Sequence, residues 1–548
     1  MSLPPYRIPP VLDLCRGVEA RAREQARAGE QTRADEQARA CEQPARTGRV
    51  PVRLLLVPTD ARPCTRGYLL DLAAATGWPV ESPPAEWLGY RREPGDAQRL
   101  QAWAAERATD GAALVASSEM LLYGGLIPSR LGRESLSEIE RRIDRLAALA
   151  TAGADLYLAA VNLRIPLSTD GGEEPDYWPA HGAALHRYSV ARDRRDLGEG
   201  HDAELIAALA EIPPAVLEDF LWRRRRNLLA NLHLVTLTAA GRARMLLVGQ
   251  DDTAPRGLTR AEMDATQALA ARVDVEGRVH LTSGADELCL RLLARLVNDR
   301  LEARPRVRVR FTFPDDRRLV PRYEAQPLED TVHGHLRAAG AEVVDANEDL
   351  LLLVHNFSGP AQKEAHDQAP GAEDAVLSTV SRLADARVRS IPAAVADVRY
   401  ANGADDQLVR HLLRHPEALG IVAYSAWNTC SNTLGTVIAD ATIALHVRRG
   451  RLGAPDAGAI LRRFLIQRFV EDWGYQAIVR KALMQDVLPH TGCAYGDIAG
   501  EEGRFEEEAR ARFEADVLPA VRAAFGPVEI ARLWFPWQRL FEVGLEVA

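Results

Sequence analysis

Short apolar runs alternate with amphipathic segments along the chain from residue 50 onward. The clearest apolar runs are 52–57, 112–116, 156–161, 245–248 and 350–354. Between them, segment 135–150 has apolar residues at Ile139, Ile143 and Leu146, which is the spacing of one helix face. Strands that alternate with helices are typical of α/β proteins with parallel sheets. The pattern therefore predicts Rossmann-like parallel-sheet units in tandem with a helical C-terminal region.

Changes in this pattern divide the chain into four parts. The N-terminal part repeats six residues, as in Glu24–Gly29 and Glu30–Asp35, and it lacks the large apolar residues that a buried face needs. The predicted parts are a low-complexity, disordered extension (1–48), a first α/β domain (49–240), a second α/β region with most of the polar strand ends (241–438) and a helical C-terminal region (439–548).

Two segments of the first domain have an unusual composition. Residues 168–202 are polar and rich in glycine and charge, which predicts a loop insertion or a lid. The expected helix 214–238 carries four consecutive arginines, Arg223 to Arg226. Successive helical residues point in different directions, so we expect a solvated helix with one or two of these arginines turned inward.

Composition excludes several classes of protein. The chain has 548 residues, 47% of them hydrophobic, and its net charge of −9 argues against a nucleic-acid partner. No stretch approaches the roughly 20 apolar residues that span a bilayer, and the N-terminus has no secretory signal. The six cysteines are scattered, which indicates reduced thiols. We expect a cytoplasmic protein without a membrane partner.

Cofactor motifs are missing from the sequence. GxGxxG, a P-loop and HExxH do not occur, so no cofactor is predicted. Glycine-rich turns at Gly124-Gly125 and at Gly284 could hold a phosphate group. A divalent metal held by carboxylate and amide oxygens stays open as an alternative.

Polar side chains follow the carboxyl ends of many predicted strands. Open α/β sheets bind their ligands at these ends, although Asp, Asn and Ser also cap helices there. The strongest acid pairs are Asp251-Asp252 and Asp286-Glu287, which we predict to be catalytic as general acid and base or as nucleophile. The predicted substrate-binding residues are Asp60, Arg62, Glu119, Tyr123, Arg130, Asn162, Arg164, Asp397, Asn402, Trp427, Asn428 and Asn432.

One strand-to-helix turn concentrates this polar character. An apolar run at 420–423 predicts a strand, and the turn that follows it contains Trp427, Asn428 and Asn432 before a helix that continues to Ala444. We expect this turn to grip a substrate. Cys430 lies in the same turn without an identified histidine partner, so a buried thiol is expected there and a nucleophile is not.

Several of these stretches together resemble an uncharacterised bacterial family, the domain of unknown function DUF4127. The stretches are Thr59–Pro63, Met120–Arg130, Asp251-Asp252, Gly284–Glu287, Ala396–Gly403 and Ala426–Gly435. The resemblance covers residues 50 to about 540, and it implies the architecture more than the chemistry. The chain departs from the family pattern at Glu119-Met120, where an Asp-Met pair is expected.

The row of polar strand ends without a cofactor motif leads to a functional hypothesis. We expect a hydrolase that acts on a sugar or another polyhydroxylated small molecule, polar or anionic, by carboxylate acid–base chemistry. Arg130 and Arg164 would bind a carboxylate or phosphate group of this substrate. The alternatives are a non-catalytic binding or sensor protein and a divalent-metal-dependent enzyme.

Overall fold

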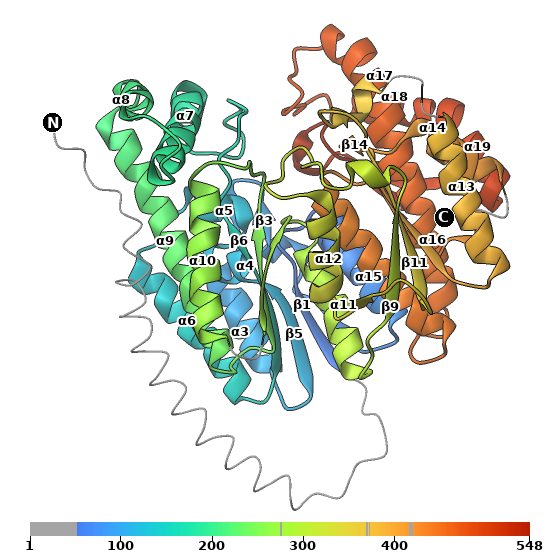
Figure 1. The fold of residues 1–548 in the computed structure, drawn as a ribbon, viewed down its shortest axis with the longest axis horizontal. Helices are drawn as coiled ribbons and strands as arrows, with labels where there is room; N and C mark the ends of the chain where they lie inside the picture. The colour runs from blue at the N-terminus through green and yellow to red at the C-terminus, as the bar shows by residue number, and fades with distance from the viewer. Residues whose placement is uncertain (1–51, 275–276, 369–370, 372, 416–419) are drawn as a thin grey trace, which may run out of the picture. The chain divides into compact units, whose positions relative to one another are not determined.

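The computed structural model describes residues 52–548 except 275–276, 369–370, 372 and 416–419 (Figure 1). The predicted extension 1–48 lies outside the described residues. The chain divides into two compact units. Unit 1 contains residues up to Asp60 together with Pro79–Ser283, and unit 2 contains Ala61–Trp78 together with Gly284–Ala548.

A parallel sheet organises the described part of unit 1. Its strands are β1 (Arg53–Val57), β2 (Val80–Glu81), β5 (Ala112–Ser117), β6 (Asp155–Asn162), β7 (Met245–Gln250) and β8 (Val279–Ser283). They lie in the order β2-β1-β5-β6-β7-β8 and all neighbours are parallel. Every residue of β5 and β7 is buried, as expected for strands covered on both faces.

Helices connect and cover the strands of unit 1 (Figure 1). They are α3 (Ala97–Arg107), α4 (Ser118–Tyr123), α5 (Leu126–Leu131), α6 (Leu136–Thr151), α7 (Trp178–Asp196), α8 (Asp202–Ala210), α9 (Pro214–Ala239) and α10 (Leu258–Val273). A small antiparallel pair, β3 (Gly89–Tyr90) and β4 (Glu93–Pro94), precedes α3. Helix α9 packs against α6 and α10.

The segment 168–202 is mostly helical, so the prediction of an irregular loop insertion was wrong. Helix α7 fills much of it and buries Trp178, Leu185 and Tyr188. These three residues pack with Phe220 and other apolar residues of the neighbouring helices.

Unit 2 repeats the strand order of unit 1. Its described parallel sheet contains β9 (Arg306–Phe311), β10 (Glu342–Val343), β11 (Leu350–Asn356), β13 (Ala393–Val398) and β15 (Ala423–Ser425). They lie in the order β10-β9-β11-β13-β15, so the second strand lies outside the first and the later strands follow on the other side, as in unit 1. The structure confirms the predicted α/β class with tandem parallel-sheet units.

The remaining elements of unit 2 are mostly helices. The helices are α2 (Tyr68–Ala75), α11 (Leu288–Arg300), α12 (Leu328–Ala338), α13 (Glu373–Val388), α14 (Asp406–Arg414), α15 (Cys430–Arg448), α16 (Ala457–Arg468), α17 (Arg480–Ala482), α18 (Glu502–Arg512) and α19 (Leu518–Phe525). The short strand pairs are β12 (Lys363–Glu364) with β14 (Tyr400–Ala401), and β16 (Ile530–Trp534) with β17 (Gly544–Val547). The predicted helical C-terminal region is confirmed, and the hairpin β16–β17 closes it.

Segment 61–78 belongs to unit 2 although the chain on both sides of it belongs to unit 1. Its helix α2 packs against α16. The hydroxyl of Tyr68 donates to Glu471 at 2.6 Å, and the guanidinium of Arg468 lies 3.6 Å from the Tyr68 ring centre. All three side chains are buried, so the segment is part of the unit 2 core.

Candidate functional site

The carboxyl ends of β6 and β7 in unit 1 bring predicted site residues together. The group consists of Arg130, Arg164, Glu173, Glu174, Asp251 and Asp252, here called the arginine–carboxylate cluster. Arg130 lies on α5, the next three residues lie after β6, and the two aspartates directly follow β7. Neighbouring parallel strands end at the same edge of a sheet, which is why the segments that follow them meet.

Arg130 binds three carboxylates of the cluster. Its Nη1 atom lies 3.2 Å from Oε1 of Glu174 and 3.3 Å from Oε2 of Glu173. Its Nη2 atom donates a hydrogen bond to Asp251. The Arg130 side chain is 4% exposed, so these contacts replace the hydration that burial removes.

Arg164 binds the same two glutamates from another direction. Its Nε atom lies 2.7 Å from Oε1 of Glu174, and its Nη2 atom lies 2.9 Å from Oε2 of Glu173. Its Nη1 atom donates to Oδ2 of Asp252 at 3.0 Å. Burial alone would lower the pKa of Arg164, but the surrounding carboxylates raise it well above its ordinary value. Arg164 therefore stays charged.

Asp252 is the carboxylic acid of the cluster with the most favourable position for proton transfer. Burial among other groups and the adjacent charge of Asp251 raise the pKa of Asp252 to about 6, against the opposing effect of Arg164 and Arg130. Its side chain is nevertheless 31% exposed, whereas that of Asp251 is 12% exposed. A carboxyl group that is reachable and half-protonated near pH 6 can act as a general acid or base.

Two arginines of α9 hold the end of α5, the helix that carries Arg130. Nη1 of Arg223 donates to the carbonyls of Leu131 at 2.5 Å and Gly132 at 2.8 Å. Nη2 of Arg226 donates to the carbonyl of Ser129 at 2.6 Å, and its Nη1 donates to Gly132 at 2.8 Å. The last carbonyls of a helix have no partner within the helix, so these guanidiniums complete a short helix that would otherwise end unsatisfied.

Arg224 holds the segment after β6 in the same way. Its guanidinium donates to the carbonyls of Leu163 at 3.0 Å and Arg164 at 3.2 Å, and it pairs with Glu262 of α10 at 2.5 Å. Arg225 is exposed. Three of the four consecutive arginines are therefore buried, and the expectation of a solvated helix with one or two turned inward was wrong. The buried carbonyls at the strand ends provide the partners that the sequence did not reveal.

Glu119 and Asn162 lie at the ends of β5 and β6 and bind the backbone of unit 1. A carboxylate oxygen of Glu119 accepts from the Val161 amide at 2.7 Å, and the other accepts from Oγ of Ser117 at 3.3 Å. Burial raises the pKa of Glu119 to about 7, although these hydrogen bonds oppose the shift. Nδ2 of Asn162 donates to the carbonyl of Thr259 at 2.9 Å.

Tyr123 and Asp60 are also buried in unit 1. The guanidinium of Arg226 lies 4.8 Å from the Tyr123 ring centre, so the ring covers one of the arginines that hold α5. Asp60 lies just after β1, at the edge of the sheet where the strand order reverses. Both residues are placed near strand ends, as predicted, with their side chains turned into the protein.

Asp286 lies in unit 2, in a second group of charged residues. Nη2 of Arg62 donates to Asp286 at 2.7 Å, and its Nη1 lies 3.3 Å from Glu542, which also binds Arg539 at 2.7 Å. The guanidiniums of Arg62 and Arg539 lie 4.3 and 4.7 Å from the ring centre of Trp537. Trp537 has a positive φ of 55°, which costs energy for a bulky residue, and the two stacked cations hold it there.

Glu287, the other member of the second acid pair, is 1% exposed and lies in the unit 2 core. It forms an ion pair with Arg291 of α11 at 3.0 Å. Burial raises the pKa of Glu287 to about 7. A Cβ atom at Gly435 of α15 would lie 2.0 Å from Cγ of Glu287, so this glycine makes room for the glutamate.

The turn before α15 is buried more deeply than a substrate grip at a surface requires. Trp427 is 1% exposed and contacts Phe541 edge to face, with ring centres 5.9 Å apart. Its Nε1 atom and Oδ1 of Asn432 are buried without hydrogen-bond partners among the described residues. The Asn402 amide donates to the carbonyl of Asn428 at 2.8 Å, and both asparagines have positive φ.

Cys430, in the same turn, is buried. Burial raises the pKa of its thiol well above the ordinary value. The amide of Gln362 lies 3.4 Å from its sulfur. This environment is that of a buried structural thiol, as the sequence predicts.

The family of the protein follows from a comparison with family models. The model described as "Protein of unknown function (DUF4127)" matches residues 54–546. The chain belongs to this family. No curated protein and no solved structure matches the chain. The DUF4127 match includes all of the predicted catalytic and substrate-binding residues.

Unit 2 of this DUF4127 protein contains a polar network at the carboxyl ends of β11 and β13, of which sequence reasoning identified Asp397 but not the partners around it. Nε2 of His355 lies 2.9 Å from Asp405, and Arg399 donates to the same carboxylate at 2.6 Å. Asp397 accepts from the Asp405 amide at 2.8 Å and from the Tyr424 hydroxyl at 3.1 Å. Burial and the charge of Asp405 raise the pKa of Asp397 to about 6, against the effect of His355. The signal available beforehand was the position of His355 directly at a strand end.

Within the described residues, no group of three or more His, Cys, Asp and Glu side chains is arranged to hold a metal ion. In the arginine–carboxylate cluster, guanidiniums occupy the space between the acids. No helix in the described ranges is both long enough and apolar enough to cross a bilayer.

Proposed function

We propose that unit 1 carries a hydrolase site for a sugar or another polyhydroxylated small molecule, with Asp251 and Asp252 as its acid–base pair. The observation that carries the proposal is the state of Asp252, which is partly exposed and has a pKa raised to about 6. The other predicted acids are less suited, because Glu119 and Glu287 are almost fully buried and Asp286 is 9% exposed.

The two aspartates would divide the proton transfers of hydrolysis. Asp252 in its protonated form donates a proton to the leaving oxygen, while Asp251 as a carboxylate accepts a proton from the attacking water. Arg164 donates a hydrogen bond to Asp252 at 3.0 Å, and Arg130 donates one to Asp251. The arginines of α9 act one step further away, as positioning residues for the segments that carry Arg130 and Arg164.

The charge of the cluster favours a neutral, hydroxyl-rich substrate over an anion. Its two guanidiniums are outnumbered by the carboxylates of Glu173, Glu174, Asp251 and Asp252. Carboxylates accept hydrogen bonds from sugar hydroxyls, whereas an anionic group would meet an excess of like charge. In this proposal Arg130 and Arg164 orient the carboxyl groups of Asp251 and Asp252. The charge of the cluster does not favour the earlier expectation that they bind a carboxylate or phosphate group of the substrate.

A substrate screen with matched variants tests the proposal. The purified protein is assayed on aryl glycosides, neutral oligosaccharides and sugar phosphates, and active substrates are repeated with Asp252→Asn, Asp251→Asn and, as a control, Asp264→Asn. Asp264 is a 67% exposed aspartate on α10 of the same unit. We expect activity to fall by about 10²–10⁴-fold in the first two variants and to persist in the control. Equal activity of Asp252→Asn and the control would refute the assignment.

The pH profile and a binding assay provide the remaining readouts. Because Asp252 must be protonated to donate, kcat/KM should fall as the pH rises through about 6. A compound that raises the melting temperature but is never converted would identify a binding protein and contradict the hydrolase. Activity lost to a chelator and restored by a divalent cation would contradict a purely carboxylate mechanism.

A further inference from the structure

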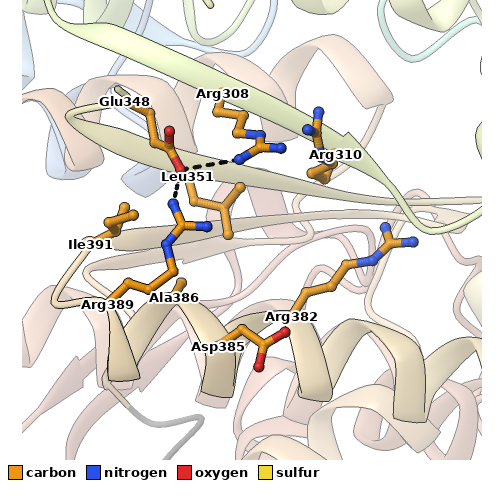
Figure 2. A pocket seen from close by; sticks show the side chains of 9 residues that line it. All are labelled: Arg308, Arg310, Glu348, Leu351, Arg382, Asp385, Ala386, Arg389 and Ile391. Atoms are coloured by element: carbon orange, nitrogen blue, oxygen red, sulfur yellow. Dashed lines mark hydrogen bonds and ion pairs between the residues drawn. The ribbon is translucent and has the colours of Figure 1, made fainter. Parts of the chain in front are cut away.

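A pocket of about 220 Å³ opens on one face of the unit 2 sheet, beside helix α13 (Figure 2). Charged side chains dominate its lining: Arg308, Arg310, Arg382, Arg389, Glu348 and Asp385. Two of the arginines come from β9, and the other two come from α13 and the turn that follows it. Figure 2 shows the guanidinium groups of Arg308, Arg310 and Arg382 in the space between the strands and the helix.

The sequence of β9 explains why this face is basic. Its residues alternate as Arg-Val-Arg-Val-Arg-Phe, with Val307, Val309 and Phe311 buried and the arginines on the other face. Successive residues of a strand point to opposite faces, so Arg308 and Arg310 lie side by side under α13. A face that normally packs apolar residues against a helix here carries cations.

The acids of the pocket neutralise only part of this charge. Glu348 forms an ion pair with Arg389, and its Oε1 atom lies 3.5 Å from Nη1 of Arg308. Arg310 donates to the carbonyl of Val309 at 2.9 Å, and Arg382 donates to that of Phe311 at 2.7 Å.

Within the described residues, neither Arg310 nor Arg382 has a carboxylate partner. Nε of Arg308 is buried without a hydrogen-bond partner in the same part of the chain. Burial, followed by repulsion from Arg308 and Arg382, lowers the pKa of Arg310, against the opposing charges of Asp345 and Glu348. Four guanidiniums and two carboxylates line the pocket, and Asp345 adds a third carboxylate near Arg310, so the pocket carries a net positive charge that favours an anion.

We propose that this pocket binds a phosphate dianion, either free or as a small phosphate monoester, through the guanidiniums of Arg310 and Arg382 with Arg308 beside them. A phosphate group carries about −1.5 to −2 charges at neutral pH, so the net positive charge of the pocket attracts it. Planar guanidiniums bind phosphate oxygens in pairs of hydrogen bonds.

The pocket volume limits the size of this ligand. Drug-sized ligands occupy pockets of roughly 300–1,000 Å³, and 220 Å³ is smaller. The site is separate from the acid–base pair in unit 1, and the proposal does not rest on the hydrolase assignment.

Isothermal titration calorimetry on the full chain tests the site, with inorganic phosphate and glycerol 3-phosphate as separate ligands. Ionic strength is held constant with chloride, because screening weakens non-specific attraction and must not vary between runs. The variants are Arg310→Met and Arg382→Met, made singly so that one remains informative if the other does not fold. The control is Arg337→Met, which removes an exposed arginine of α12 in the same unit.

We expect saturable binding at millimolar concentration or below, weakened about tenfold or more in either pocket variant and unchanged in the control. Tighter binding of the ester identifies a phosphorylated metabolite, and equal or tighter binding of phosphate identifies the free ion; both support the site. Asp252→Asn should bind like the unaltered chain, which separates this proposal from the hydrolase. Absence of saturable binding, or pocket variants that bind like Arg337→Met, would overturn the proposal.

Discussion

The buried carboxyl group of Glu119 should make unit 1 less stable as the pH rises, and Glu119→Gln should remove this dependence. The glutamine retains an oxygen to accept from the Val161 amide and an NH₂ group that can donate to Oγ of Ser117, so the packing is preserved. Only the ability to ionise is lost. The comparison therefore measures the free energy of holding a charge at this position.

The expected magnitude follows from the pKa of Glu119, which burial raises from 4.5 to about 7. The folded protein keeps its proton over this interval while the unfolded chain loses it, so the free energy of unfolding falls as the pH rises from 4.5 to 7. Each pKa unit corresponds to about 1.4 kcal/mol, which gives a loss of about 3 kcal/mol at pH 8. At pH 5 the loss is under about 1 kcal/mol.

Calorimetric melting at pH 5 and pH 8 measures this difference between Glu119→Gln and the unaltered chain. At about 2–4 °C per kcal/mol, the variant should melt about 6–12 °C higher at pH 8 and nearly level at pH 5. Asp144→Asn, which changes an exposed carboxylate on α6, should shift melting little and equally at both pH values. If the melting temperatures of Glu119→Gln and the unaltered chain differed by the same amount at pH 5 and pH 8, the reasoning would be refuted.

Two further substitutions test how the buried partners are held. Arg223→Met removes the donor to the Leu131 carbonyl and leaves the Gly132 carbonyl with Arg226 alone, so we expect a loss of about 1–3 kcal/mol in urea unfolding. Arg225→Met, on the exposed side of the same helix, should change little. Gly435→Ala places a Cβ atom 2.0 Å from Cγ of Glu287 and should cost about 1–3 kcal/mol. Gly458→Ala, with open space around its Cβ position in α16, should be neutral or slightly stabilising, and a similar loss in both glycine variants would contradict the crowding argument.

Much of the fold is predictable from the sequence because the apolar runs are strong local signals. The helix expected at 214–238 is α9, which begins at Pro214 and ends at Ala239. The helix α7 was missed because its many charged residues obscure the apolar positions, whose packing partners lie on other helices. The strand predicted at 420–423 is instead β15 at Ala423–Ser425, a small displacement within an apolar stretch that does not mark its own ends.

The candidate site is predictable only in part. Arg130, Arg164, Asp251 and Asp252 were found because they follow strand ends, which meet at one edge of a sheet. Glu173 and Glu174 were not found, because they reach the cluster through a fold-back of the chain that no local spacing encodes. The capping alternative holds elsewhere: Asp405 accepts from the Gln407 amide at the start of α14, which is the ordinary function of an aspartate there.

The assignment of Ala61–Trp78 to unit 2 has a consequence during synthesis on the ribosome. Tyr68 binds Glu471, which lies 403 residues later in the chain. At roughly 5–20 residues per second, the segment emerges about 20–80 s before its partner exists. Its apolar residues, among them Leu69 and Leu72, are exposed in the nascent chain for that interval. Cutting the gene once after Ser283 would therefore leave unit 2 without this segment, which would stay attached to unit 1.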